Sequence, residues 1–152
     1  VVASARSRRP GTEEDGVAFV DTSTLLATSD VVSVLTPLTP ETHHLIDATA
    51  LAAMKPTAYL INTARGAIVD EKALARVLAE GGLGAAGLDV FAEEPLPLNS
   101  PLRHLDNVVL TSHLGWPADL TYTTMAQAAV AIASPASPPR PVWWLRASMK
   151  LV

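Results

Sequence analysis

Three side chains in this sequence are of types that suit acid–base chemistry on a small carboxylic acid. The imidazole of His113 can donate or accept a proton near neutral pH, and a carboxylate such as Glu94 beside it favours the protonated form. The guanidinium of Arg65 can bind a carboxylate through two hydrogen bonds and polarise a neighbouring carbonyl. Taken singly, each also has an ordinary interpretation as a solvated or ion-paired side chain, so their placement in the fold decides between the two.

Arg65, Asp89 and His113 each belong to a polar cluster that follows a β-branched run, and a fourth cluster, Thr36–Pro40, follows another. Six such runs are candidate strands: Val1–Ala5, Val17–Val20, Val31–Leu35, Ala58–Asn62, Ala85–Val90 and Val108–Thr111. The carboxyl ends of parallel strands lie at one edge of a sheet, where open α/β sheets bind ligands. We therefore expect the four clusters to meet at one edge.

The elements that would position these clusters alternate along the chain. The runs Val31–Leu35 and Val108–Thr111 are almost continuously apolar, which is typical of parallel strands covered on both faces. Helical patterns lie between or after the strands, at Thr22–Ser29, Thr49–Lys55, Asp70–Glu80 and Asp119–Ala133. Thr22 and Asp47 are candidate N-caps. The alternation predicts an α/β fold, a partial doubly wound parallel sheet of the Rossmann-like type.

Composition excludes several classes of function. The chain carries 11 Lys and Arg against 15 Asp and Glu, a formal net charge of −4, so we expect no nucleic-acid partner. The lack of cysteine excludes a disulfide scaffold, a thiolate zinc site and a cysteine nucleophile, and we expect no metal site. No apolar run approaches the ~20 residues of a membrane helix, so we expect no membrane partner and a cytoplasmic location.

Three long segments carry a family resemblance. "NTARGAIVDEKAL", "GLDVFAEEPLPLNSPL" and "LDNVVLTSHLG" closely resemble, in order and spacing, the nicotinamide-dependent D-isomer-specific 2-hydroxyacid dehydrogenases, which include glyoxylate/hydroxypyruvate reductases. The resemblance runs from about Val1 to Ala133. It implies an oxidoreductase domain that transfers hydride between NAD(P)(H) and a small 2-hydroxy or 2-oxo acid, from a protein that forms a homodimer at full length.

The resemblance also assigns the three reactive side chains. Arg65 would bind the substrate carboxylate and 2-oxo group, His113 would be the acid/base, and Glu94 would be its partner. Glu94 matches better than Glu93 because it directly precedes a proline. The remaining histidines have no motif around them and are expected at the surface: His43, His44 and His104.

Cofactor residues follow from the same resemblance. Asp89 matches the family residue that holds the nicotinamide end of the cofactor. The other expected contacts are Arg6, Ser7, Thr36, Pro37, Thr63, Ala64 and Gly115. An acidic residue after the second strand would bind the ribose of NAD, whereas Arg6 and Ser7 suit a 2′-phosphate, so the cofactor is NAD or NADP with NADP favoured. The alternative, a solvated basic turn beside acidic residues 13–15, carries equal weight.

The chain also departs from the family pattern. The first strand and its glycine-rich loop are missing, and Trp116-Pro117 follows Gly115 where the family commonly has a second glycine. Residues 134–152, rich in proline and tryptophan, read as a poorly ordered tail after a dinucleotide-binding portion at 1–133.

We therefore expect a fragment that does not turn over by itself. In it, either Val1–Ala5 pairs directly with Val31–Leu35, or the first ~20 residues are loosely held while residues 31–133 stay compact, because the strand between them is missing. The alternative function is a catalytically silent remnant or interaction module that keeps the fold.

Overall fold

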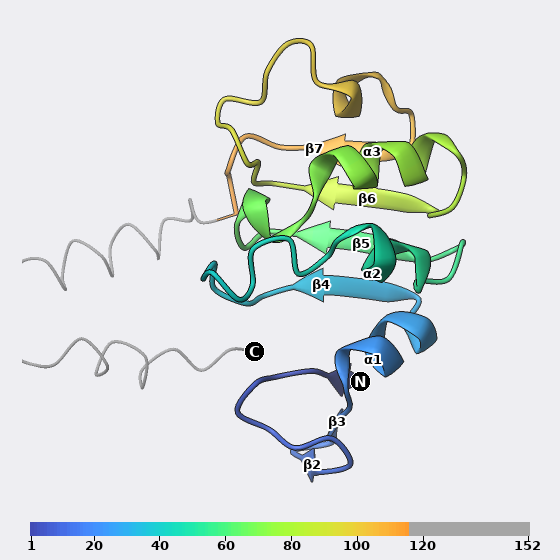
Figure 1. Cartoon of the computed structure of the whole chain (residues 1–152), viewed down its shortest axis with the longest axis vertical. Helices are drawn as coiled ribbons and strands as arrows, with labels where there is room; N and C mark the ends of the chain where they lie inside the picture. Colours follow the sequence, from blue (N-terminus) through green and yellow to red (C-terminus); the bar gives the residue numbers. More distant parts are fainter. Residues whose placement is uncertain (116–152) are drawn as a thin grey trace, which may run out of the picture. The chain divides into compact units, whose positions relative to one another are not determined.

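Two separate sheets make up the part of the chain that the structure describes. The structure is a computed structural model, and it describes residues 1–115 (Figure 1). One sheet has three short strands in the order β1-β3-β2, and the other has four strands in the order β4-β5-β6-β7. The predicted helix Asp119–Ala133 and the predicted tail 134–152 lie outside the described residues.

The four-stranded sheet is parallel throughout, which confirms the predicted topology of this part of the chain. Its strands are β4 (Val31–Val34), β5 (Tyr59–Asn62), β6 (Ala85–Leu88) and β7 (Val108–Leu110). Val31 pairs with Tyr59, and Tyr59 in turn pairs with Ala85, so the strands begin in register. Each strand is one or two residues shorter than its β-branched run, and all four carboxyl ends reach the same edge (Figure 1).

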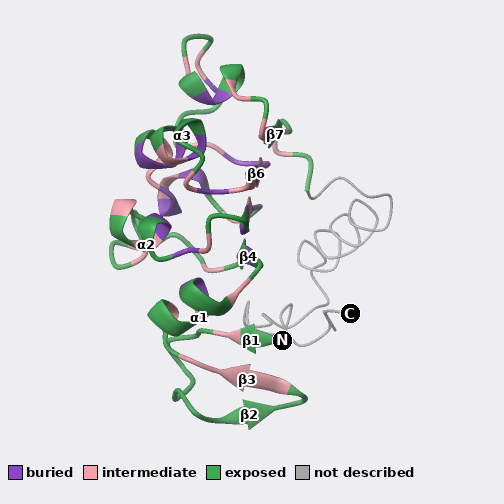
Figure 2. Cartoon of the chain, turned by 90° about the vertical axis from the view of Figure 1, so that its right-hand side faces the viewer, coloured by how far each residue is buried: buried purple, intermediate pink, exposed green. Residues whose placement is uncertain are grey.

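Helices cover one face of this sheet. The described helices α1 (Thr22–Thr28), α2 (Ala48–Ala52) and α3 (Glu71–Ala79) lie on the same side of it (Figure 2). Val32 and Val34 of β4 face that side and are buried, whereas Val31 is 57% exposed. Within residues 1–115, the apolar run of β4 therefore alternates in burial, and the described helices cover one face of the sheet where cover on both faces was expected.

Side-chain caps start the helices. Asp21, not the predicted Thr22, caps α1, and its carboxylate accepts a hydrogen bond from the Thr24 amide at 2.8 Å. Asp47 caps α2 as predicted. Asp70 caps α3 by accepting from two backbone amides of the first turn. These caps satisfy donors that a helix leaves free at its N-terminus.

The core lies between the four-stranded sheet and α2 and α3. Its largest side chains at 0% exposure are Leu51, Leu60, Ile68 and Leu74. Two short 3-10 helices, η1 (Gly66–Ile68) and η2 (Pro101–His104), each contribute a buried side chain to it. Over residues 1–115, none of the helices has the length and apolar character needed to cross a membrane.

The first strand pairs within the small sheet and not with the strand that one expectation gave it. β1 (Val2–Ala3) pairs with β3 (Val17–Phe19) in parallel, not with Val31–Leu35 as one expectation had it. The unpredicted strand β2 (Glu13–Glu14) pairs with β3 in antiparallel direction. Asp15 and Gly16 connect them with φ angles of 52° and 77°, the left-handed conformation that tight hairpin turns use.

Candidate active site

The parallel topology brings the predicted polar clusters to one edge. The loops after β4, β5, β6 and β7 leave neighbouring strands in the same direction (Figure 1). A cavity of about 340 Å³ opens there, with Arg65, Glu94 and His113 in its wall. The rest of its lining was not predicted and consists of Leu38, Gly66, Ala67, Phe91 and Ala92. Three side chains from three loops thus share one cavity.

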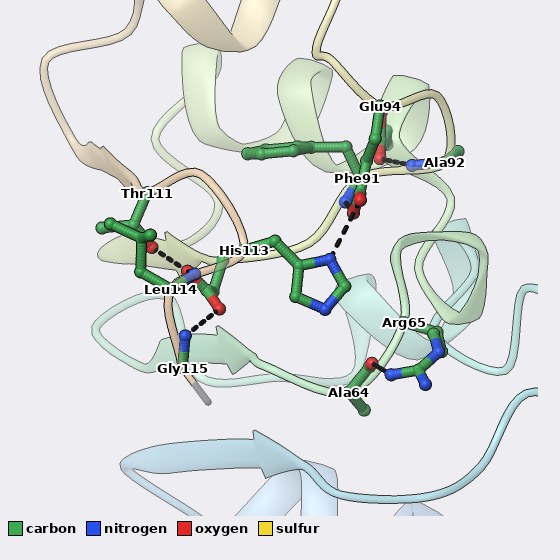
Figure 3. A network of polar contacts seen from close by, with 11 residues as sticks. Ala64, Arg65, Phe91, Ala92, Glu94, Thr111, His113, Leu114 and Gly115 are labelled. Carbon is green, nitrogen blue, oxygen red and sulfur yellow. Dashed lines mark hydrogen bonds and ion pairs between the residues drawn. The ribbon is translucent and has the colours of Figure 1, made fainter. Parts of the chain in front are cut away.

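The imidazole of His113 is hydrogen bonded to Glu94 (Figure 3). His113 Nδ1 lies 2.9 Å from Glu94 Oε2, and Glu94 Oε1 accepts the Phe91 amide at 3.0 Å. The bond to His113, followed by the Phe91 amide and the charges of His113 and Arg65, lowers the pKa of Glu94 below its usual value despite partial burial. A carboxylate on Nδ1 requires a proton there, so Nε2, on the side of the ring away from Glu94, is the atom that can exchange its proton.

The backbone of His113 adopts a left-handed conformation, with φ at 58°. This region is uncommon for a residue with a side chain, so surrounding contacts must hold it. The His113 amide donates to the Asp89 carbonyl at 2.8 Å. The Asp89 carboxylate accepts the amides of Leu114 and Gly115, each at 2.7 Å, and the hydroxyl of Thr111 (Figure 3). Asp89 therefore fixes the turn that presents the imidazole.

Burial and hydrogen bonding act in opposite directions on the ionisation of Asp89, a residue that is 6% exposed. Burial acts to raise its pKa. The hydrogen bonds from Thr111, Leu114 and Gly115, with the charge of His113, together outweigh burial, so the pKa lies below its usual value. The buried carboxylate is therefore ionised and paired with donors.

Arg65 follows β5 in a loop that Asn62 shapes. The Asn62 side chain is buried at 1% exposure, donates to the Arg65 carbonyl at 3.0 Å and accepts the Ala64 amide at 3.1 Å. The Arg65 guanidinium donates to the Ala64 carbonyl at 2.6 Å. None of the ion pairs within residues 1–115 involves Arg65, so its exposed guanidinium can still bind an anion.

Gly66 brings the Arg65 loop into contact with the Glu94 loop. A Cβ atom at Gly66 would lie 1.8 Å from the Phe91 carbonyl carbon and 2.2 Å from the Ala92 nitrogen, far inside any possible contact. Only glycine fits this close backbone approach. The glycine directly after Arg65 is the available sequence signal. Phe91, whose backbone it approaches, lies 25 residues further along the chain, and no local pattern identifies this contact.

The predicted cofactor residues divide into two groups. Thr36 and Pro37 follow β4, and Thr63 and Ala64 follow β5, at the edge that also carries the cavity. Asp89 and Gly115 are joined by the hydrogen bond described above. Among residues 1–115, Gly115 is the one donor to Asp89 Oδ2, and the second lone pair of this oxygen suits a further donor such as the carboxamide of a nicotinamide.

The second group, Arg6 and Ser7, lies in the exposed loop after β1 and does not line the cavity. The pKa of Glu41 is lowered, first by the Thr39 hydroxyl and in smaller part by the charge of Arg6. Arg8 is ion paired with Glu14 at 2.8 Å. His43, His44 and His104 are exposed, as predicted.

A G-x-G-x-x-G spacing occurs at Gly82, Gly84 and Gly87, but this segment leads into strand β6 and not into a helix. Gly82 and Gly84 lie before β6, at the end of the sheet opposite the cavity, and Gly87 lies within the strand. A Cβ at Gly84 would lie 2.9 Å from the Thr57 carbonyl oxygen, and one at Gly87 would lie 3.1 Å from Ile61 Cδ1. They serve strand packing, since a phosphate loop of this spacing follows a strand and starts a helix.

Comparison with known proteins confirms the resemblance carried by the three motifs. Residues 1–115 match the family model described as "D-isomer specific 2-hydroxyacid dehydrogenase, NAD binding domain". Glyoxylate/hydroxypyruvate reductase B of Pectobacterium atrosepticum is 50% identical over 131 residues, which cover 86% of this chain and 41% of that protein. The chain thus spans less than half the length of this curated relative.

Comparison with solved structures supports the same family. A crystal structure of a Thermus thermophilus protein superposes with a TM-score of 0.82 at 45% identity, over 93% of this chain and 45% of that one. A D-isomer specific 2-hydroxyacid dehydrogenase of Xanthobacter autotrophicus Py2, in complex with NADPH and MES, superposes with a TM-score of 0.74 at 36% identity, over 90% and 57%.

Proposed function

The chain belongs to the D-isomer specific 2-hydroxyacid dehydrogenases, and we propose that it supplies the acid–base and carboxylate-binding groups of a reductase for small 2-oxo acids. The observation that carries the proposal is the shared cavity, in which Arg65 stands opposite a His113 that is hydrogen bonded to Glu94. An unpaired guanidinium beside an imidazole–carboxylate pair suits an anion that bears a carbonyl next to its carboxylate.

The roles of the three side chains follow from their contacts. The Arg65 guanidinium binds the substrate carboxylate and polarises the 2-oxo group. His113 Nε2 donates its proton to the carbonyl oxygen during reduction and takes it back in the reverse direction. Glu94 holds Nδ1 protonated and stabilises the imidazolium before transfer. A nicotinamide cofactor, when bound, supplies the hydride.

The described residues fit such a cofactor, and we propose which of them hold it. Asp89 would accept a hydrogen bond from the carboxamide through Oδ2, and the other contacts would be Thr36, Pro37, Thr63, Ala64 and Gly115. NAD stands in the description of the family model, and the Xanthobacter relative binds NADPH. For this chain we favour NADP, because Arg6 and Ser7 in the exposed loop after β1 offer a cation and a hydroxyl to a 2′-phosphate.

The test of function uses a chimera in which this chain replaces the matching segment of the Pectobacterium reductase. The chimera should reduce glyoxylate or hydroxypyruvate in a coupled absorbance assay. His113→Gln should lower kcat by about 10²–10⁴, the usual contribution of a positioned acid/base. His104→Gln, at an exposed histidine outside the cavity, is the matched control and should leave kcat unchanged. A folded chimera without activity would favour the silent remnant, and an active His113→Gln chimera would remove His113 from the mechanism.

The cofactor preference is tested in the same chimera. The ratio of kcat/KM for NADPH to that for NADH should exceed one, and Arg6→Asp should reverse or flatten it. Arg76→Asp, which makes the same charge change at an exposed position of α3, should leave the ratio as it is. A preference for NADH in the chimera with native Arg6 would show that the basic loop after β1 is only a solvated turn.

We propose three further features of the whole protein. The family resemblance supports a homodimer, which light scattering of the full-length protein would test. The composition supports a cytoplasmic location. The family match over residues 1–115 and the prolines beyond residue 134 support a dinucleotide-binding portion at 1–133 followed by a tail at 134–152. Limited proteolysis would place that boundary.

A further inference from the structure

The loop that carries Glu94 is held by a second carboxylate, from α3. Glu71, in the first turn of α3, accepts the Ala92 amide at 2.6 Å through Oε1. Glu94 accepts the preceding amide, that of Phe91, at 3.0 Å. Two carboxylates thus bind consecutive amides of one loop, one from within the loop and one from outside it (Figure 3 shows the Phe91–Glu94 loop).

The position of this loop decides where Glu94 points. One oxygen of Glu94 faces His113 Nδ1, and the other is bound to the backbone of its own loop. A shift of the Phe91–Ala92 peptide would therefore move the carboxylate that orients the imidazole. The proton-donating atom of His113 would move with it, and displacements of about 1 Å in such groups can cost on the order of 10²-fold in rate.

The same peptide unit also touches the Arg65 loop. Gly66, which follows Arg65 directly, leaves no room for a Cβ against the Phe91 carbonyl carbon and the Ala92 nitrogen. Glu71 lies on α3, which begins shortly after η1 on the same stretch of chain. The Phe91–Ala92 peptide is therefore held between the backbone of Gly66 and the carboxylate of Glu71. The segment that carries Arg65 and the loop that carries Glu94 are fixed to each other at this point.

We infer that Glu71 is a positioning residue of the site, and that its hydrogen bond to the Ala92 amide sets the placement of Glu94 relative to His113 and Arg65. The catalytic consequence rests on the proposed function, but the geometric one does not. Glu71 does not line the cavity, so it acts through the loop and not on a substrate. Burial raises the pKa of Glu71, and the nearby charge of Glu94 adds to this, whereas the Ala92 amide and His44 lower it. Burial disfavours the charged form of Glu71, and a fully exposed glutamate would not carry this penalty. The partly buried position of Glu71 therefore fits a role in holding the loop.

The test compares three variants of Glu71 in the 152-residue chain by NMR. Glu71→Gln removes the charge and keeps a side-chain oxygen that can accept the Ala92 amide. Glu71→Ala removes both, and Glu71→Asp keeps the charge but withdraws the acceptor by one methylene. Glu80→Ala, at an exposed glutamate that ends the same helix, is the matched control. Hydrogen exchange of the Ala92 amide and the carboxyl titration of Glu94 are the readouts.

In the Ala and Asp variants we expect exchange of the Ala92 amide to accelerate by about 10-fold or more, because the amide loses its acceptor. The pKa of Glu94 should rise toward its ordinary value, because the bonds from Phe91 and His113 that lower it are loosened. The Gln and Glu80→Ala variants should keep the exchange rate of the Ala92 amide close to that of the native chain. Unchanged exchange and titration in both the Ala and Asp variants would overturn the inference. So would a Gln variant that behaves like the Ala variant, because charge would then matter instead of the hydrogen bond.

Kinetics of the chimera separate this inference from the proposed function. Glu71→Ala should lower kcat about 10-fold with a smaller change in KM, since Glu94 and His113 act in proton transfer. Glu71→Gln should restore kcat. If the chimera is inactive but the NMR effects appear, the proposed function fails and the positioning role stands. If the chimera is active and Glu71→Ala has native kcat and native NMR behaviour, the positioning role fails and the proposed function stands.

Discussion

Replacing Asp89 with asparagine should destabilise the fold and loosen the turn that presents His113. Asp89 is 6% exposed as a residue, and its carboxylate accepts three donors, the amides of Leu114 and Gly115 and the hydroxyl of Thr111. The asparagine oxygen can keep the donors now on Oδ1, but the amide nitrogen then faces the Gly115 N–H and cannot accept from it.

The cost follows from the bond that is lost. A hydrogen bond to a charged group contributes about 1.5–3 kcal/mol, and Gly115 would face a donor instead of an acceptor. We therefore expect Asp89→Asn to lower the free energy of unfolding by about 2 kcal/mol at pH 7. The exposed Asp106, in the segment before β7, provides the control: Asp106→Asn should change this free energy by less than about 0.5 kcal/mol.

Urea unfolding of the 152-residue chain at several pH values is the assay. The pKa of Asp89 lies below its usual value in the folded state. Its contribution to stability is therefore fully present above the unfolded-state pKa, near 3.9, and is lost as the pH falls through the folded-state pKa. The difference between native and Asp89→Asn chains should thus shrink below about pH 3.9. A difference below about 0.5 kcal/mol at pH 7, or one that stays constant down to about pH 2.5, would refute the assignment of these hydrogen bonds to an ionised Asp89.

Three other substitutions test the site and the core. Arg65→Ala in the chimera should lower kcat/KM for glyoxylate roughly 10- to 150-fold, the loss of one charge-assisted contact, and an unchanged value would remove Arg65 from the mechanism. Gly66→Ala should lower the free energy of unfolding by about 3 kcal/mol, because its Cβ would overlap the Phe91 carbonyl carbon, whereas Gly82→Ala meets mainly a side chain and should cost much less. Leu51→Ala, at 0% exposure, should lower the free energy of unfolding in urea by about 2–5 kcal/mol, and a smaller loss would mean that neighbouring side chains fill the space left by the leucine.

The sequence was sufficient to predict the four-stranded sheet and the edge at which the site lies. Runs such as Val31–Leu35 and Ala85–Val90 have strong strand propensity, and parallel strands necessarily place their following loops together. It did not predict β2, because Glu13–Glu14 is two polar residues long and pairs only through the hairpin. The sequence predicts Thr22 as the N-cap of α1, whereas the Asp21 side chain accepts the amide; both residue types are good N-caps, so only the geometry shows which one caps the helix.

The contacts that assemble the site depend on close approaches between segments distant in sequence. Gly66 meets the Phe91–Ala92 peptide, and Glu71 reaches the Ala92 amide from 21 residues away. No periodicity or cap preference signals either contact. The family resemblance therefore names Arg65, His113 and the two carboxylates that hold the imidazole, but it does not name Gly66 or Glu71, whose contacts join the Arg65 and Glu94 loops.

The charges of the site explain why its arginine remains open to an anion. Glu94 is near enough for the charge of Arg65 to act on its pKa, yet the two are not ion paired. Each oxygen of Glu94 accepts one hydrogen bond, one from His113 and one from the Phe91 amide, and the Arg65 guanidinium donates to the Ala64 carbonyl. These bonds orient Glu94 toward His113 and its own loop, and they orient the guanidinium toward its own loop. Arg65 therefore stays available for an anion.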